Sequence, residues 1–284
     1  MTSPGPASHH LGRCIEVAIV TRATPARVWD AWTDPDRLVE WFADRVEGSL
    51  EEGRIAWSFE RLKSTMAFRV VAVTVGARLL LESLDREPRR LELLIGGVPG
   101  GTEVRVIDSG FSNAGAEDED FVAADSGWRI ALPILRYYVE FHFNQPRESF
   151  FVLRPARFTP SLLSRLYREP DGLKEWLSDG GSLGTPGGRV HLALKDGETL
   201  RGDMLADTGT ELAMAWDEIA GVLQFKTCVL PGEVGTRSVY LHGWGWGISG
   251  DRARHVERRL SEAVDRLERA LDQADADRSV LTST

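Results

Sequence analysis

An internal repeat constrains the fold of this chain more than any other feature of its sequence. The stretch PDRLVEWFAD at 35–44 returns as PDGLKEWLSD at 170–179. Further along, GTEVRVID at 101–108 lies over GTRSVYLH at 235–242, with one residue of slippage relative to the first match. Because the repeat length is about 135 residues, the size of an ordinary domain, the sequence predicts a tandem duplication of one fold.

Both halves have the same order of predicted elements. A short strand, at 14–22 and at 149–157, precedes a Thr-Pro pair that is typical of a helix start. The repeated stretch predicts a corner between two short helices, which Trp41 and Trp176 anchor. Strands with alternating apolar residues and a long final helix complete each half. The fold class is therefore α+β, with a curved antiparallel sheet against a long C-terminal helix and a pocket between them.

The first long helix contains a proline that leaves two alternatives open. Its apolar positions run without a break from Trp128 to Val139, which favours a helix kinked at Pro133. In the alternative, the helix begins near Leu132 and the proline lies in its first turn, where it costs nothing. The second long helix is predicted over 251–274 without interruption.

Composition excludes several classes of function. The chain has 284 residues, 42% of them hydrophobic, and a net charge of −9, so it has no broad basic face and nucleic acid is not expected as a partner. No apolar run approaches the roughly 18–20 residues that cross a bilayer, and the first 13 residues lack the apolar middle that a signal peptide is expected to have. The two cysteines have no CxxC spacing, which indicates free thiols and a cytoplasmic protein.

The boundary between the halves is short. We expect a first domain over 10–147 and a second over 148–275, with 1–9 and 276–284 disordered. Only about four residues join the last helix of the first domain to the first strand of the second, so the domains are expected to touch. Their pockets could then merge into one elongated apolar channel.

The candidate site residues are aromatic side chains on the expected pocket walls, together with a few polar groups. Asp108 and His242 fall on equivalent positions of the repeat and are expected to face the two pockets, where they could orient a ligand or move a proton. No histidine has the spacing of a metal site, so neither a metal nor a cofactor is predicted. The full set of predicted ligand-binding residues is Trp57, Phe59, Asp108, Trp128, Tyr137, Tyr138, His142, Trp216, Tyr240, His242, Trp244 and Trp246.

The segments ATPARVWDAWTDPDRLVEWFAD, GTEVRVIDSGF and SGWRIALPILRYYVE resemble the AHSA1-like branch of the START/Bet v1 superfamily, the helix-grip proteins. The resemblance covers nearly all of the first half and reaches the second through the repeat. The tandem form is similar to di-domain START-like proteins of bacterial polyketide and enediyne pathways. It implies a cytoplasmic protein that binds a hydrophobic polyketide or polyene-like intermediate, with biosynthetic partner proteins that the sequence does not identify.

Three alternatives to simple binding remain open at this stage. The first is a cofactor-independent cyclase or aromatase that uses Asp108, His142 or His242 for proton transfer, although no acid–base pair at a fixed spacing supports an enzyme. The second is a self-resistance protein that sequesters the ligand. The third is an Hsp90-type co-chaperone, which the family name suggests.

Overall fold

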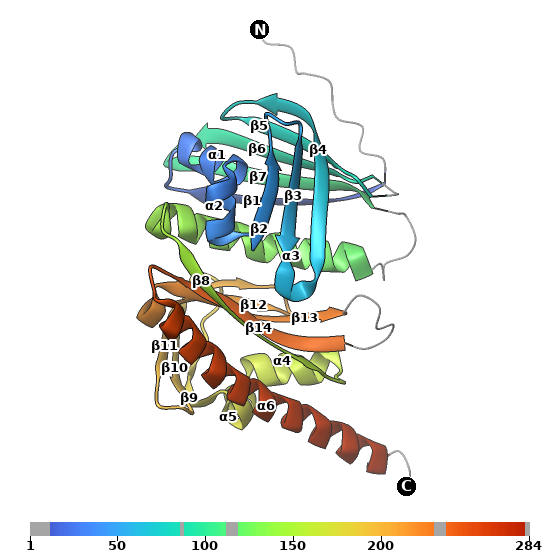
Figure 1. Cartoon of the computed structure of the whole chain (residues 1–284). Coiled ribbons are helices and arrows are strands. Elements are labelled where there is room, and N and C mark those ends of the chain that lie inside the picture. Colours follow the sequence, from blue (N-terminus) through green and yellow to red (C-terminus); the bar gives the residue numbers. More distant parts are fainter. Residues whose placement is uncertain (1–11, 86–87, 112–118, 230–236, 282–284) are drawn as a thin grey trace. The chain divides into compact units, whose positions relative to one another are not determined.

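The computed structural model describes residues 12–85, 88–111, 119–229 and 237–281, which form two compact units (Figure 1). The first unit ends at Phe143 and the second continues from Asn144. We call them the first and the second domain. The expected disordered segment 1–9 lies outside the described residues. Of the segment 276–284, the part up to Leu281 belongs to the last helix, because no glycine or proline ends the helix at 274.

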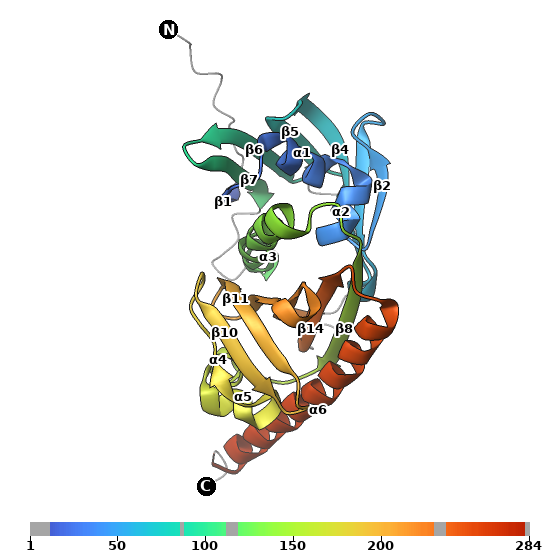
Figure 2. The same ribbon diagram turned by 90° about the vertical axis from the view of Figure 1, so that its left-hand side faces the viewer.

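The first domain is a curved antiparallel sheet with a long helix on its concave side (Figure 2). Among the described residues the sheet has seven strands in the order β1-β7-β6-β5-β4-β3-β2, and the final helix α3 packs along β1. Its elements are β1 Arg13–Thr21, α1 Pro25–Thr33, α2 Pro35–Trp41, β2 Arg45–Ser49, β3 Arg54–Phe59, β4 Ser64–Thr74, β5 Arg78–Ser83, β6 Arg90–Val98, β7 Gly101–Phe111, α3 Glu119–Tyr137 and a π-helical turn Tyr138–His142.

The second domain repeats this topology element by element. Its sheet, again counted over the described residues, has the order β8-β14-β13-β12-β11-β10-β9, and α6 packs on β8 and β14. Duplication, fold class and helix-grip architecture are therefore confirmed. Its elements are β8 Arg147–Pro155, α4 Pro160–Arg168, α5 Pro170–Trp176, β9 Ser178–Ser182, β10 Arg189–Leu194, β11 Thr199–Asp207, β12 Leu212–Trp216, β13 Gly221–Val229, β14 Arg237–Trp246 and α6 Gly250–Leu281.

The repeated sequence stretch is a structural anchor in both domains. The indole N–H of Trp41 donates to the carbonyl oxygen of Ala31 at 2.9 Å, and that of Trp176 donates to Leu166 at 2.8 Å. Each donor therefore reaches back to the end of the preceding helix and satisfies a carbonyl that has no partner within that helix. The two tryptophans occupy equivalent positions, as predicted.

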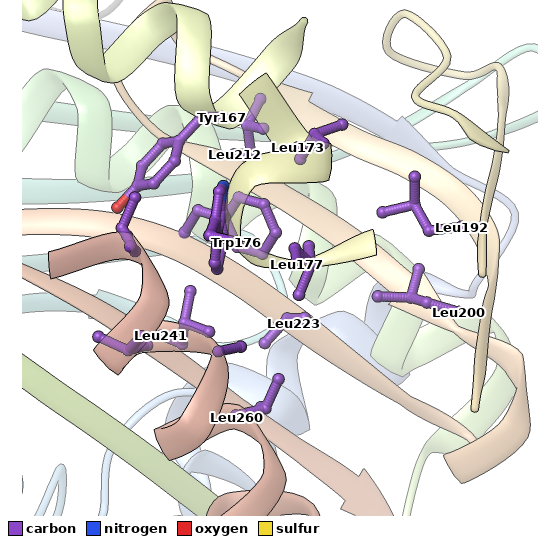
Figure 3. Close-up of a cluster of buried hydrophobic side chains, with 14 of the residues drawn as sticks. Tyr167, Leu173, Trp176, Leu177, Leu192, Leu200, Leu212, Leu223, Leu241 and Leu260 are labelled. Atoms are coloured by element: carbon purple, nitrogen blue, oxygen red, sulfur yellow. The ribbon is translucent and has the colours of Figure 1, made fainter. Parts of the chain in front are cut away.

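The core of the second domain is closely packed around Trp176 (Figure 3). Leucine side chains from α5, from the strands and from α6 surround the indole, and the apolar stripe of α6 contains no aromatic residue. Representative members of this core are Leu173, Leu177, Leu192, Leu223, Leu241 and Leu260.

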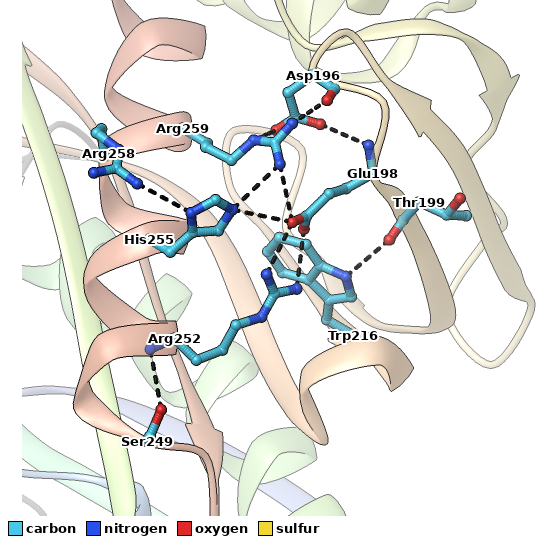
Figure 4. A network of polar contacts seen from close by, with 9 residues as sticks. All are labelled: Asp196, Glu198, Thr199, Trp216, Ser249, Arg252, His255, Arg258 and Arg259. Atoms are coloured by element: carbon cyan, nitrogen blue, oxygen red, sulfur yellow. Dashed lines mark hydrogen bonds and ion pairs between the residues drawn. The ribbon is translucent and has the colours of Figure 1, made fainter.

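An ionic network fixes the start of α6 to the β10–β11 turn (Figure 4). Glu198 accepts hydrogen bonds from Arg252 at 2.9 and 3.1 Å and from Arg259 at 3.1 Å, and Arg259 also contacts Asp196 at 2.9 Å. His255 lies 3.4 Å from the same carboxylate. Burial alone would raise the pKa of Glu198, but the arginine contacts outweigh it and hold the pKa below its usual range.

Pro133 lies inside α3, so the alternative in which the helix begins near Leu132 is wrong. The helix starts at Glu119 and continues through the proline into the π-helical turn, where Glu140 reaches the end of β1. Glu140 accepts hydrogen bonds from the Thr21 hydroxyl at 2.9 Å and from the Arg22 backbone N–H at 2.8 Å. These contacts hold the C-terminal end of the long helix against the sheet.

Candidate functional site

Four aromatic side chains of the first domain meet between the helices and the concave face of the sheet. Trp32 of α1 lies 6.3 Å from Trp57 of β3 and 5.9 Å from Trp128 of α3, measured between ring centroids. The ring centroid of Phe42, which follows α2, lies 5.3 Å from that of Trp57 and 5.9 Å from that of Trp128. We call these four residues the aromatic cluster. The three tryptophans are buried, whereas Phe42 is only half-buried.

Two of the predicted residues, Trp57 and Phe59, lie on one face of β3 as the period of two requires. Phe59 extends the aromatic cluster, since its ring lies 5.4 Å from Phe42, and it is also half-buried. The cluster therefore keeps part of its surface exposed on the side of Phe42 and Phe59.

A buried carboxylate adjoins the aromatic cluster. Asp108 shares a face of β7 with Val104 and Val106, is 4% exposed, and accepts a hydrogen bond from the indole N–H of Trp128 at 3.0 Å. Burial raises the pKa of Asp108, and the Trp128 hydrogen bond and the charge of Arg89 offset this effect only in part. The carboxyl group is thus poised to hold a proton where an exposed aspartate would have lost it.

Two indole N–H groups of the aromatic cluster lack a hydrogen-bond acceptor. Trp32 is 1% exposed and Trp57 is 0% exposed, and within the described part of the chain no acceptor lies within reach of either nitrogen. A buried donor without a partner costs about 1–3 kcal/mol. Such a cost is unusual in a core that satisfies Trp41 and Trp128.

The remaining predicted residues of the first domain lie at the other end of α3. Tyr138 donates a hydrogen bond to Glu40, which also pairs with Arg37, and its ring stacks on Trp41 at 6.5 Å. The rings of Tyr137 and His142 lie 5.1 Å apart, next to Phe141.

Asp108 and His142 are therefore not an acid–base pair. Asp108 contacts α3 at Trp128, and His142 follows fourteen residues later, which corresponds to roughly 21 Å along a helix. Proton transfer that needs both groups at one reacting centre is excluded by this spacing.

The predicted equivalence of Asp108 and His242 is wrong. Asp108 pairs with Ile15 across β1 and β7, and the repeat partner of Ile15, Phe150, pairs with Gly243 across β8 and β14. The structural counterpart of Asp108 is therefore Gly243, so β7 and β14 keep the 135-residue offset (243 − 108) that relates β1 to β8. A register error of one residue reverses the face of the sheet to which a side chain points.

The second domain fills the place of the buried carboxylate with a ring. A Cβ atom added to Gly243 would lie 2.5 Å from the Phe150 ring. The aromatic cluster is also replaced, because the repeat partners of Trp32, Phe42 and Trp57 are residues of the packed core: Tyr167, Leu177 and Leu192.

Of the five predicted site residues in the second domain, only Trp216 lies in its core, where the indole N–H donates to Thr199 at 3.1 Å. Tyr240, His242, Trp244 and Trp246 alternate with Val239 and Leu241 of the core and lie on the opposite face of β14. The expectation that they line the space between sheet and α6 is wrong, because alternation along β14 directs them away from the face that carries Val239 and Leu241.

Polar chemistry on that outer face is limited. Arg147 lies over the Trp244 ring at 4.6 Å, and the His242 and Trp244 rings are 5.2 Å apart. Burial, and then the charges of Arg147 and Lys226, lower the pKa of His242, so the imidazole is neutral at physiological pH.

Within the described ranges, no group of three or more His, Cys, Asp or Glu side chains could hold a metal ion. In the same ranges no helix is long and apolar enough to cross a membrane.

Sequence reasoning missed two members of the aromatic cluster. Trp32 belongs to the first short helix and Phe42 to the repeated stretch, and neither was predicted as a site residue. The available signal was the comparison between the halves: at both positions the second half has a different residue, while the anchor tryptophans are unchanged.

Two curved seven-stranded sheets, as counted in the described segments, each with a long C-terminal helix, define a tandem helix-grip protein. Residues 22–140, within the first domain, match the model of the family described as Activator of Hsp90 ATPase homolog 1-like protein. No curated protein matches the chain.

Solved structures with similarity to the chain include two that cover both domains. DynU16, from the dynemicin biosynthetic locus, is 20% identical over 91% of this chain and 98% of its own, with a TM-score of 0.41. BexL, a di-domain ARO/CYC protein from the BE-7585A biosynthetic pathway, is 17% identical over 91% of this chain and 96% of its own, also at 0.41. The Aha1 dimer from Colwellia psychrerythraea is 18% identical over 45% of this chain and 97% of its own, at 0.40.

Proposed function

We propose that the first domain binds a hydrophobic, ring-containing or conjugated small molecule of the polyketide or polyene class between α3 and the sheet, at the aromatic cluster. The observation that carries the proposal is the difference between two copies of one fold. The first copy buries a carboxylate and two indole N–H groups without acceptors among aromatic rings, and the second has at these places the Phe150 ring, Leu192 and Tyr167, whose hydroxyl donates to the carbonyl oxygen of Lys226.

The energetics favour binding over a purely structural role. Unpaired donors and a desolvated carboxyl group reduce the stability of a core, so a cluster that retains them is expected where function needs them. Phe42 and Trp128 already stack at an interplanar angle of 13°, and a planar ligand would extend this stack on the half-buried side of Phe42. Each CH₂ that the ligand buries there contributes about 0.8 kcal/mol.

The proposed ligand site is confined to the first domain. The core of the second domain has no counterpart of Asp108 or of the aromatic cluster. The extension of the binding site into this domain stays a prediction from the sequence.

Ligand titration and native mass spectrometry of the full chain test the proposal. Native mass spectrometry of protein from its source organism should detect a retained apolar molecule. Anthracene, as a polycyclic probe, should quench tryptophan fluorescence and saturate at one molecule per chain. Phe59→Leu, at the open side of the aromatic cluster, should weaken binding severalfold. Phe158→Leu, which alters a partly buried ring packed on the core of the second domain, is the matched control and should not. Equal effects of the two variants would contradict the assignment.

A catalytic version of the proposal is favoured by Asp108 alone. A carboxyl group with a raised pKa beside an aromatic site can donate a proton to a bound carbonyl. Asp108→Asn should then abolish turnover of a poly-ketone substrate while leaving its binding intact. Turnover that survives this substitution would leave the protein a binder only.

A further inference from the structure

The aromatic cluster carries information about the polarity of its ligand. An indole N–H only donates, so Trp32 and Trp57 together present two buried donors and no acceptor. The fold supplies acceptors to the other buried indoles whose bonds are known, namely those of Trp41, Trp128, Trp176 and Trp216. The two indoles of the first domain that lack an acceptor, those of Trp32 and Trp57, thus both lie at the proposed ligand site. In the second domain, Trp244 also lacks an acceptor among the described residues, but it lies on the outer face of the sheet, beneath Arg147.

The charges around the site indicate that the ligand's acceptor is neutral. In the described part of the first domain, every buried charged side chain is acidic: Glu40, Glu82, Glu92 and Asp108. A carboxylate or phosphate of the ligand would be buried near Asp108, where the charge of the half-buried Arg89 already offsets the burial of one carboxyl group only in part, so a second anion is costly. A ketone or quinone oxygen accepts two hydrogen bonds without that cost.

We propose that the ligand of the first domain carries neutral carbonyl oxygens, as in a ketone or a quinone, and that the indole N–H groups of Trp32 and Trp57 donate hydrogen bonds to them. This inference rests on the proposed function and specifies its ligand. The two tryptophans are then specificity-determining residues, because an analogue without the oxygens leaves both donors unpaired.

A pair of probes that differ only in the carbonyl groups tests this inference. Anthracene and anthraquinone have the same fused-ring framework, so the ratio of their dissociation constants isolates the contribution of the oxygens. The parent protein should bind anthraquinone at least tenfold more tightly. The double variant Trp32→Phe/Trp57→Phe should reduce this ratio to near one. Trp41→Phe is the matched control, since Ala31 already accepts its indole hydrogen bond, and it should keep the ratio.

A second measurement uses the unmodified chain, so its result does not depend on whether the tryptophan variants fold. The chain contains nine tryptophans, so the ¹H–¹⁵N spectrum has at most nine indole signals. Anthraquinone should move two of these to lower field, as expected when a free donor gains an acceptor, and anthracene should not.

Three outcomes separate the two proposals. Selective binding of anthraquinone with the two indole shifts supports both. Equal binding of the two probes without indole shifts overturns the present inference and leaves the proposed function standing. In that case the N–H groups are directed at neighbouring ring faces, for which Trp57 and Phe42 have a suitable interplanar angle of 87°. Failure of both probes to bind refutes both proposals for polycyclic ligands.

Discussion

Asp108→Asn should change how the stability of the first domain depends on pH. Because burial raises the pKa of Asp108, the folded domain keeps a proton over a range in which the unfolded chain, with a pKa near 3.9, has released it. In that range the folded state binds more protons, so the free energy of unfolding falls as pH rises. The loss is about 1.4 kcal/mol for each unit by which the pKa is raised, and it is complete above the folded-state pKa.

The asparagine variant lacks this loss but keeps an oxygen for the Trp128 indole. The free energy of unfolding of the variant, relative to that of the parent, should therefore increase from about pH 4 upward and become constant above the folded-state pKa of Asp108. Asp108→Ala is a second comparison, since it leaves the indole N–H of Trp128 without an acceptor. That variant should be less stable than Asp108→Asn by about 1–3 kcal/mol throughout.

Hydrogen exchange of β7 amides as a function of urea reads the stability of the first domain separately from the second. Asp36→Asn, at an exposed carboxylate, controls for the change of net charge. A stability difference between Asp108→Asn and the parent that stays constant from pH 4 to pH 8, or that decreases over this range, would refute the interpretation of Asp108 as a desolvated carboxyl group.

Three further predictions concern packing and charge. Gly243→Val should unfold the second domain in circular dichroism, because a Cβ there would overlap a phenylalanine ring and a backbone carbonyl, whereas Gly180→Ala, with open space around it, should be neutral. Glu198→Gln should cost about 1 kcal/mol in urea melts at pH 7; since the pKa of Glu198 is lowered, this difference should vanish as pH falls through its folded-state pKa. Trp41→Phe and Trp176→Phe should each lower the thermal midpoint of their own domain by a similar amount, because both lose the same hydrogen bond.

The repeat made most of the fold predictable. It placed two helix corners, two sheets and two final helices, and Trp41 and Trp176 make equivalent hydrogen bonds, as the alignment requires. Helix starts were predictable for a local reason, since Thr24 and Thr159 accept hydrogen bonds from their own first turns. Such features depend on a few neighbouring residues and can be identified without the fold.

The site was predictable only in part, because strand register is not a local property. Alternation along a strand determines which face Trp57, Phe59 and Asp108 share with their neighbours, and their role in ligand binding stays a prediction. His242 was misplaced by a shift of one residue in aligning the two halves. The hydrogen bonds between β8 and β14, which link residues about ninety positions apart, fix the register, and no sequence pattern in either strand contains that information.

The two domains show how a duplicated fold can divide stability and function. At the position of Asp108 the second copy has a glycine, and the Phe150 ring occupies the freed space; at Trp57 and Phe42 it has leucines that join a continuous core. Each of these differences removes a buried polar group or replaces a flat ring by a compact side chain, and each favours packing. The first copy retains the costly groups in one place, with half-buried rings at its edge. If those groups served only the fold, the same substitutions would be expected in both copies. Their concentration at the aromatic cluster is the basis on which we propose ligand recognition by the first domain.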